Sequence, residues 1–312
     1  QFRRELQMYS NCNLNQSHKV LGSDPAYIMF TSGSTGFPKG AVITNEGLLH
    51  FIMWSKNTFS IKTDHIFTNI NPMYFDNSVF DFYSSLLTGA GLAPIADKLT
   101  KNPRRMVKYI EEMKCTHWFS VPSMLVYALK MRAIDAGDMT ALKTIIFGGE
   151  GFPKSGLREL YALLGKRISF VNVYGPTECT CICSSYSVDE KDLADPTLLP
   201  LGSIASQFTF RIINDDGGEA KNGEPGELCL KGVGVGLGYY NNTEQTERAF
   251  VADPFAGTKA ERMYKTGDIV WYEEKTNLLW FCGRKDNQIK IMGHRVELEE
   301  IDVALNGLDG VR

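Results

Sequence analysis

The chain has 312 residues, of which 43% are hydrophobic and 22% charged, and its formal net charge at pH 7 is −3. This composition is typical of a globular protein with room for two packed units, and the near-balanced charge argues against binding to nucleic acid or to an anionic membrane. No apolar run approaches the roughly 20 residues that cross a bilayer, and no signal-peptide pattern opens the chain, so we expect no membrane insertion.

The seven cysteines are an odd number with irregular spacing, which predicts reduced thiols and a cytoplasmic location. Cys179, Cys181 and Cys183 alternate and would share one face of a strand. A metal site is one interpretation, although tetrahedral zinc sites usually have two-residue gaps between cysteines. Burial as small apolar side chains is the interpretation that we favour.

Residues 31–40 form a loop of glycines, hydroxyl side chains and one lysine between two apolar runs, 27–30 and 41–43, that predict buried strands. Glycines let backbone N–H groups approach a ligand closely, and a lysine adds positive charge. The loop therefore suits a polyphosphate. The residues expected to contact it are Thr31, Ser32, Gly33, Ser34, Thr35, Gly36 and Lys39.

Three other interpretations of this loop are weaker. A Walker A loop needs Gly-Lys-Ser/Thr, whereas Lys39 lies between Pro38 and Gly40. No Gly-x-Gly-x-x-Gly opens a helix here, so a Rossmann fingerprint is also excluded. A flexible linker has this composition, but Pro38 and the strands on both sides argue against it.

The next part of the chain alternates between strand and helix patterns. Residues 45–57 predict a helix, and the runs 144–147 and 168–171 predict buried strands with a helix at 153–164 between them. Strand, helix and strand in repetition predict a parallel sheet with helices on its faces. The apolar residues expected on one side of the first helix are Leu48, Leu49, Ile52 and Met53.

Two motifs follow the predicted strands, at the sheet edge where ligands of open parallel sheets collect. The first is Gly-Gly-Glu at 148–150, whose glycines permit a planar ring to approach the backbone. In the second, at 172–178, Tyr174 offers a flat face for a purine, Thr177 can donate to a phosphate oxygen, and Glu178 is an oxygen ligand suited to Mg²⁺. The alternative for the second motif is a Tyr-Gly-Pro turn with a capping Thr.

From about residue 200 the pattern changes to short strands, as at 210–213 and 227–230, separated by turn residues. We expect a β-rich unit, a small distorted barrel. Within it the sequence Thr-Gly-Asp ends at Asp268, whose carboxylate could accept two ribose hydroxyls or could simply belong to a turn. Alternating glycines mark a close-packed strand or bend rather than a nucleotide loop: Gly232, Gly234, Gly236 and Gly238.

Five segments, in this order along the chain, resemble motifs of the adenylate-forming superfamily: 31–40, 148–150, 172–178, 264–268 and 283–297. That superfamily comprises acyl- and aryl-CoA synthetases, luciferases and the adenylation domains of peptide synthetases. The resemblance implies an α/β fold in which a parallel-sheet adenylate-binding subdomain (1–200) precedes a smaller β-rich subdomain (201–285). Residues 286–312 would hold the hinge and the start of a truncated C-terminal domain.

The resemblance also implies residue roles. Thr177, Glu178 and Lys39 would serve catalysis, Glu178 would bind Mg²⁺, and Asp286 would be the hinge residue. Besides the loop residues above, the implied ATP-binding residues are Gly149, Glu150, Asn172, Tyr174, Gly175, Thr177, Asp268 and Arg284.

Residues 75–79, Phe-Asp-Asn-Ser-Val, resemble the acid-binding segment of peptide-synthetase adenylation domains and D-alanine–carrier-protein ligases. There Asp76 would pair with the ammonium of an amino acid; the alternative is an acid in the first turn of a helix. D-alanine ligases carry a cysteine where this chain has Gly148, so we expect more room and a larger substrate side chain. The other implied pocket residues are Asn77, Phe80, Ser120, Ile146, Gly148, Val173, Cys181 and Ile182.

The implied reaction joins an amino-acid carboxylate to ATP, giving aminoacyl-AMP and pyrophosphate with Mg²⁺ as cofactor. The acyl group would pass to the phosphopantetheine thiol of a carrier protein. An acyl- or aryl-CoA ligase would keep every motif except the role of Asp76. The family's C-terminal lysine has no counterpart here, so we also expect a fragment of a longer ligase, and a non-catalytic nucleotide-binding protein stays open.

Overall fold

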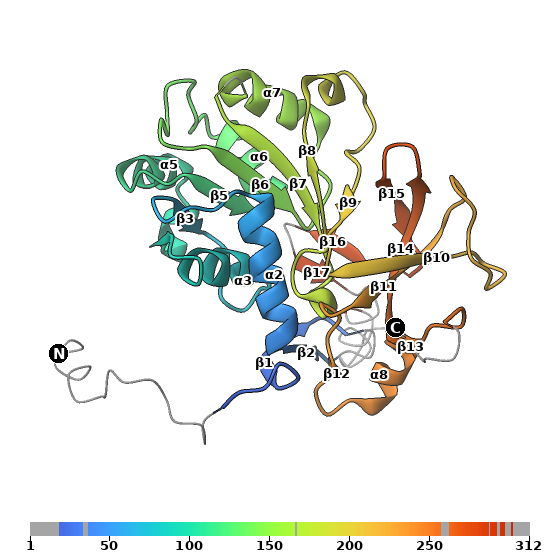
Figure 1. Ribbon diagram of the computed structural model, residues 1–312. Helices are drawn as coiled ribbons and strands as arrows, with labels where there is room; N and C mark the ends of the chain where they lie inside the picture. Colours follow the sequence, from blue (N-terminus) through green and yellow to red (C-terminus); the bar gives the residue numbers. More distant parts are fainter. Residues whose placement is uncertain are drawn as a thin grey trace, which may run out of the picture.

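A computed structural model describes residues 19–33, 37–165, 167–256, 262–286, 288–291, 294–296 and 301. Within these ranges the chain forms a large α/β part, a hairpin that supports it, and a β-rich part (Figure 1). The predicted order of an α/β region followed by a β-rich region is confirmed. No helix among the described residues is long and apolar enough to cross a membrane.

The predicted phosphate loop joins two strands of a hairpin. β1 (Pro25–Thr31) and β2 (Lys39–Thr44) are antiparallel, with Thr31 opposite Lys39. A third strand, β12 (Gly238–Tyr239), lies about 200 residues further along the sequence and pairs with β2. The strands predicted on both sides of the loop are confirmed, and β2 is buried as predicted. The predicted burial of 27–30 is wrong, because Ile28 and Phe30 are 39% and 60% exposed on β1, which has a partner strand on one side only. Three loop residues lie outside the described part of the chain: Ser34, Thr35 and Gly36.

A seven-stranded sheet in the order β4-β3-β5-β6-β7-β8-β9 forms the centre of the α/β part. Strands β3 to β7 are parallel, and β8 and β9 are antiparallel to their neighbours. The carboxyl ends of β6 and β7 therefore lie at one edge, as the sequence predicts. The bounds are β3 (Ile66–Asn69), β4 (Gly91–Pro94), β5 (His117–Ser120), β6 (Thr144–Gly148), β7 (Ser169–Tyr174), β8 (Ser184–Ser187) and β9 (Ser203–Ile204).

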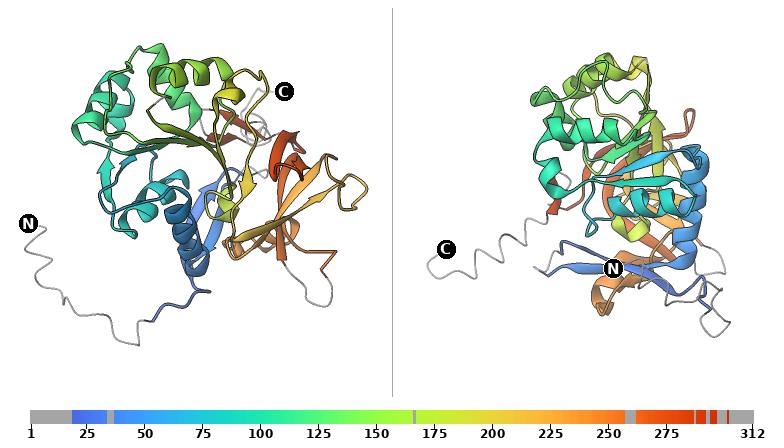
Figure 2. Two further views of the ribbon diagram at one scale, coloured as in Figure 1. Left: turned by 45° about the horizontal axis from the view of Figure 1, so that its top comes forward. Right: turned by 90° about the vertical axis from the view of Figure 1, so that its left-hand side faces the viewer.

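Helices cover both faces of this sheet (Figure 2). The short α3 continues directly into a π-helical stretch, Phe80–Ser84. Single 3₁₀ turns occur at Thr177–Cys179 and Glu190–Leu193. The α-helices are α2 (Asn45–Thr58), α3 (Asn77–Val79), α4 (Asp97–Thr100), α5 (Pro103–Glu112), α6 (Pro122–Lys130), α7 (Lys154–Leu164) and α8 (Thr243–Ala249).

Alternation along the buried strands separates two cores. On β6, Ile145 and Phe147 point into the core beneath α5, α6 and α7, whereas Ile146 points to the opposite core with α2 and Phe80. Buried strands of parallel sheets are apolar on both faces, which explains the continuous apolar runs in the sequence. The buried face of α2 was predicted only in part. Leu48 and Ile52 are buried, but Leu49 and Met53 are 55% and 62% exposed. The buried face continues through Phe51 and Ser55 instead.

The β-rich part is a five-stranded antiparallel sheet with its own core. Two strands that follow residue 200 pair outside this sheet: β9 is the edge strand of the seven-stranded sheet, and β12 belongs to the hairpin sheet. Strand pairing therefore crosses the predicted domain boundary at residue 200, and that boundary stays a prediction. A small hairpin follows the sheet. The bounds are β10 (Phe208–Ile213), β11 (Gly226–Gly232), β13 (Phe250–Ala252), β14 (Arg262–Glu273), β15 (Leu278–Arg284), β16 (Ile289–Ile291) and β17 (His294–Val296).

Candidate active site

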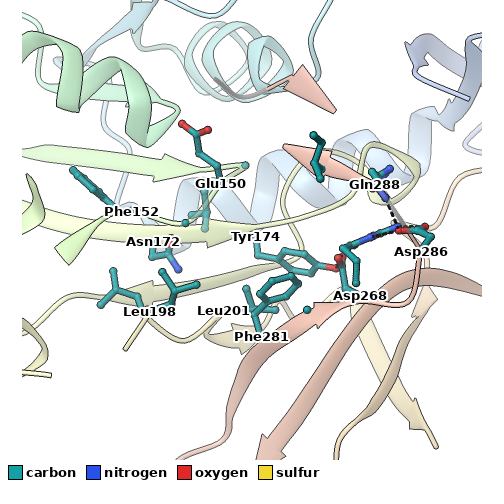
Figure 3. A pocket seen from close by; sticks show the side chains of 17 residues that line it. Glu150, Phe152, Asn172, Tyr174, Leu198, Leu201, Asp268, Phe281, Asp286 and Gln288 are labelled. Atoms are coloured by element: carbon teal, nitrogen blue, oxygen red, sulfur yellow. Dashed lines mark hydrogen bonds and ion pairs between the residues drawn. The ribbon is translucent and has the colours of Figure 1, made fainter. Parts of the chain in front are cut away.

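A cavity of about 550 Å³ opens between the carboxyl ends of β6 and β7 and the β14–β15 pair (Figure 3). Because the two parts of the fold meet here, residues far apart in sequence face each other: Tyr174 ends β7, Asp268 lies in β14 and Arg284 ends β15. Six residues predicted for nucleotide binding line this cavity, together with Val173 and Asp286. They are Gly149, Glu150, Asn172, Tyr174, Asp268 and Arg284.

Asp268 is held from two sides. The Tyr174 hydroxyl donates to its Oδ2 at 2.5 Å, and Arg284 Nη1 donates to its Oδ1 at 2.8 Å. Burial first, and the Asp268 carboxylate second, raise the pKa of Tyr174 well above its usual value, so the phenol stays a donor. A carboxylate fixed in this way at a cavity wall is suited to accept the paired hydroxyls of a ribose.

Arg284 also forms a bidentate ion pair with Asp286, the predicted hinge residue. Its Nε and Nη2 lie 2.8 Å and 2.5 Å from the two carboxylate oxygens of Asp286, while Nη1 also donates to the Thr266 carbonyl at 2.8 Å. Burial alone would lower the pKa of Arg284, but the bonds to Asp286 and the charge of Asp268 raise it, so the guanidinium stays charged. The Arg284 fork therefore ties the nucleotide cavity to the segment that follows β15.

Two other predicted nucleotide residues have structural partners. Glu150 Oε1 accepts the Ser123 backbone N–H at 2.7 Å and so caps α6, whose own N-cap residue Val121 offers no side-chain acceptor. Asn172 Nδ2 donates to the Pro200 carbonyl at 2.8 Å. These contacts fix the cavity wall made by the two strand ends.

A second cavity, of about 120 Å³, adjoins the first and is lined by the end of β1 and the start of α3. The Thr31 and Ser32 hydroxyl oxygens are buried, and among the described residues no hydrogen-bond partner contacts either of them. Buried hydroxyls without partners are costly unless a ligand satisfies them. Phosphate oxygens of a nucleotide fit this requirement. Residues shared by both cavities are Gly149, Tyr174, Asp268, Arg284 and Gln288.

Of the three predicted catalytic residues, only Thr177 lines a described cavity. Lys39 is 8% exposed, and its Nζ lies 5.1 Å from the centre of the Tyr239 ring. Glu178 is fully buried, and its Oε1 accepts the Tyr239 hydroxyl at 2.7 Å. One carboxylate next to Thr177 fits a Mg²⁺ ion held mainly by substrate phosphates; no cluster of three or more metal-ligating side chains occurs within the ranges described above.

Asp76 lines the second cavity at the start of α3, as expected for an acid-binding residue. It is the N-cap residue of this helix, although its side chain makes no capping hydrogen bond. The helix is anchored further along, where Asn71 Nδ2 donates both to Asp81 Oδ2 at 2.9 Å and to the Phe119 carbonyl at 3.0 Å. Burial raises the pKa of Asp81 well above its usual range, although the hydrogen bond from Asn71 opposes this shift.

The remaining predicted acid-pocket residues pack largely against one another. Phe80, Ile146, Val173, Cys181 and Ile182 belong to one apolar cluster, and of these only Val173 lines a described cavity. Asn77 lines the second cavity beside Asp76. Ser120 is buried and accepts the Trp118 Nε1–H at 2.9 Å.

The extra room expected at Gly148 is not there. A Cβ at this position would lie 2.3 Å from the Val173 carbonyl oxygen, because β6 and β7 approach closely where Gly148 pairs with Val173. Glycine therefore serves the contact between the strands instead of enlarging the acid pocket.

The three alternating cysteines do not lie in a strand, so the predicted shared face is wrong. Cys179 ends a 3₁₀ turn, and Thr180 and Cys181 follow with φ of 53° and 72°. All three thiols are buried, and the six described cysteines are free. Their interpretation as small buried side chains agrees with the apolar clusters in which they pack.

Sequence reasoning missed the apolar walls of the larger cavity and one polar neighbour. The leucines and Phe281 carry no motif, because single leucines and aromatic residues are common in any core, whereas Gln288 and Ile289 lie in the motif at 283–297 without a predicted role in binding. Phe281 follows Trp280 along β15, and neighbouring residues of a strand point to opposite faces of the sheet. This alternation does not indicate which of the two faces a cavity. The missed residues are Leu198, Leu199, Leu201, Phe281, Gln288 and Ile289.

Comparisons with known proteins agree with this geometry. A family model described as "AMP-binding enzyme" matches residues 3–240. The D-alanine--D-alanyl carrier protein ligase of Bacillus anthracis is 37% identical over 288 residues, which cover 92% of this chain and 56% of that protein. The chain therefore spans about half the length of the curated relatives that it matches.

Solved structures give the same result. The Vibrio cholerae adenylation domain AlmE, in complex with glycyl-adenosine-5'-phosphate, is 28% identical with a TM-score of 0.83, covering 93% of this chain and 54% of that one. An NRPS protein containing adenylation and PCP domains is 26% identical with a TM-score of 0.82, covering 93% of this chain and 57% of that one. The resemblance drawn from the motifs is confirmed, and the chain belongs to the family of AMP-binding enzymes.

Proposed function

We propose that this protein binds ATP and adenylates the carboxylate of an amino acid, giving aminoacyl-AMP and pyrophosphate. The observation that carries the proposal is the pair of adjoining cavities, which share Tyr174, Asp268 and Arg284. The larger one suits a nucleoside, with Asp268 for the ribose. The smaller one has unsatisfied hydroxyls for phosphate oxygens and Asp76 at its wall.

The reaction needs positioning and charge stabilisation more than a protein nucleophile. An oxygen of the substrate carboxylate attacks the α-phosphorus, and the bond from that phosphorus to the bridging oxygen of pyrophosphate breaks. Thr177 would donate to the α-phosphate, and Thr31, Ser32 and Lys39 would contact the phosphates that leave. Bound Mg²⁺, held by Glu178, would neutralise phosphate charge.

Asp76 favours an amino acid over other acids. Its carboxylate lines the smaller cavity at the start of α3, where it would pair with the substrate ammonium. A carboxylate is the natural partner of a substrate ammonium in a partly closed site. The relative named as a D-alanine–carrier ligase and the adenylation domain solved with a glycyl adenylate agree with this class of substrate.

We further propose that the acyl group passes to the phosphopantetheine thiol of a carrier protein, with Asp286 as the hinge for the second step. The carrier in the relative's name and the PCP domain in a similar structure support this acceptor over CoA. Residues 1–200, 201–285 and 286–312 would be the three units of this movement. A cytoplasmic location is proposed from the free thiols of the six described cysteines.

ATP–pyrophosphate exchange by the full-length protein tests the proposal, using a panel of L- and D-amino acids together with fatty and aryl acids. Exchange that depends on an amino acid supports it. Exchange only with acids that lack an amino group would favour the acyl- or aryl-CoA ligase. Binding of ATP without exchange on any acid would favour a non-catalytic nucleotide-binding protein.

A further inference from the structure

We infer that Tyr239 is a positioning residue that holds the Lys39 ammonium and the Glu178 carboxylate in place for the nucleotide's phosphates and metal. The inference rests on the proposed use of ATP. Tyr239 lines neither cavity and has no predicted site role, yet it contacts two of the three predicted catalytic residues.

The contacts of Tyr239 are of two kinds. Its hydroxyl donates to Glu178 Oε1 at 2.7 Å, and its ring lies beneath Lys39 Nζ, 5.1 Å from the ring centre. All three side chains are buried, with exposed fractions of 6% for Tyr239, 8% for Lys39 and 0% for Glu178. A buried charge needs a partner, and one aromatic side chain gives a partner to each.

The backbone around Tyr239 joins the same two elements. β12 pairs with β2, so that Tyr239 lies opposite Ala41, two residues from Lys39. On the other side, the Gly236 N–H donates to the Glu178 carbonyl at 2.8 Å. One short segment therefore bridges the strand that carries the lysine and the turn that carries the glutamate.

The alternating glycines of this segment now have a physical reason. A Cβ at Gly236 would lie 2.7 Å from the Val42 carbonyl oxygen and 3.1 Å from the Glu178 carbonyl oxygen, so only glycine lets the segment pass between them. The Thr180 hydroxyl adds a bond to the Gly234 carbonyl at 2.7 Å. Thr180 has a left-handed φ of 53°, and this contact helps to hold it there.

A neutral partner suits this place better than a further charge. Tyr239 offers an O–H to the carboxylate and a ring face to the ammonium, and it adds no charge of its own. Both groups are thereby oriented before the ligand arrives, which lowers the ordering cost of binding.

The competing explanation is that Tyr239 only fills the core, since its ring also packs edge-on against Phe250 with centres 5.5 Å apart. Tyr239→Phe separates the two roles because it keeps the ring contacts with Lys39 and Phe250 and removes only the hydroxyl. Tyr240→Phe is the matched control: it removes a phenol hydroxyl from the next residue, whose side chain is 57% exposed.

Calorimetric titration with ATP, in Mg²⁺ and in EDTA, tests the inference on the wild-type protein and both variants. Tyr239→Phe is expected to match the wild type in EDTA and to bind about tenfold more weakly in Mg²⁺, the effect of one lost hydrogen bond to a charged group. Tyr240→Phe is expected to match the wild type in both. Equal affinities of Tyr239→Phe and wild type in both buffers, or an equal loss in both, would overturn the inference.

Failure of the wild type itself to bind ATP would instead remove the proposed function, and the inference with it. A second measurement needs no nucleotide: thermal unfolding of Tyr239→Phe, Glu178→Gln and the double variant. Because the two side chains share a hydrogen bond, their effects on the melting temperature are expected to be non-additive. Additive effects would show that the contact does not couple them.

Discussion

The Tyr174 hydroxyl donates to Asp268 Oδ2 at 2.5 Å although 94 residues separate the two in sequence. With Arg284 on the other oxygen, the Asp268 carboxylate has a fixed orientation at the wall where the two cavities join. The end of the parallel sheet and the β-rich part thus build one site, and neither could do so alone.

Replacing Asp268 is therefore expected to weaken nucleotide binding. Asp268→Ala removes the acceptor for ribose hydroxyls and leaves part of the Arg284 fork without its partner. ATP affinity measured by calorimetry should fall at least about tenfold, as for a lost hydrogen bond to a charged group. Asp216→Ala, in an exposed turn, is the control. An affinity of Asp268→Ala equal to that of the control would contradict the role of Asp268.

Arg284→Lys keeps the positive charge but loses the planar fork that holds Asp268 and Asp286 together. An ammonium cannot donate to both carboxylates and the Thr266 carbonyl in this geometry. We expect a lower melting temperature, equivalent to about 1–3 kcal/mol of unfolding free energy, and weaker ATP binding. Arg248→Lys, in an exposed pair with Glu244, should change neither quantity. If Arg284→Lys behaves like that control, the fork has no role in either.

Asp76→Ala is expected to separate acid activation from nucleotide binding. Loss of one partner of a largely desolvated charge pair costs roughly 3–5 kcal/mol, so amino-acid-dependent pyrophosphate exchange should fall at least about a hundredfold. ATP affinity should stay that of the wild type, because Asp76 does not line the larger cavity proposed for the nucleoside. Asp97→Ala, on the exposed start of α4, is the matched control. Near-normal exchange by Asp76→Ala would show that another group binds the substrate.

Gly148→Ala tests the close contact between β6 and β7. The new methyl group would meet the Val173 carbonyl at 2.3 Å, so the strands must move apart at an expected cost of about 1–3 kcal/mol. Chemical denaturation measures this directly. Gly137→Ala is the control, since no atom lies within 4 Å of a Cβ there. Equal stability of the two variants would mean that the acid pocket does have room at Gly148.

Acid should destabilise the fold through His117. Burial first, and the neighbouring His65 second, lower the pKa of His117 to about 4. Since the unfolded imidazole takes up a proton near pH 6.5, the folded state binds fewer protons between these values. Stability is therefore full above about pH 6.5 and falls as the pH drops toward about 4.

The other groups around His117 act in both directions: a backbone hydrogen bond with Phe59 raises its pKa, and the charge of Lys143 lowers it. The His117 ring stacks on Phe67, and its centre lies 4.7 Å from that of the His65 ring. Burial and the charge of Lys143 lower the pKa of His65, whereas the charge of Asp64 raises it. His117→Gln should flatten the fall in melting temperature between pH 7 and pH 5. An unchanged slope would assign the acid sensitivity to other groups.

Much of the fold was predictable because its signals are short-range. The apolar runs that became β6 and β7 alternate with the helix α7, and the loops at their ends carry Tyr174 and Gly149. Patterns of this kind identify the edge of a sheet at which a ligand collects. Asp268 and Arg284 were singled out by the motifs that resemble the adenylate-forming superfamily, and both line the larger cavity.

The parts that could not be predicted depend on contacts between distant segments. Nothing near Tyr239 in sequence indicates that its hydroxyl reaches Glu178, and the left-handed turn at Thr180 that breaks the cysteine alternation is imposed by packing. The exposed positions of Leu49 and Met53 follow from where α2 lies on the sheet, which its own sequence does not specify. Tertiary packing, and not the local sequence pattern, determines burial and backbone conformation at these positions.

The most direct test of the central claim is a crystal structure of the protein with a non-hydrolysable aminoacyl-adenylate. We predict the adenine against Tyr174, the ribose hydroxyls on Asp268 and the ammonium within hydrogen-bond distance of Asp76. An adenylate bound with its ribose away from Asp268, or its amino group away from Asp76, would contradict the account.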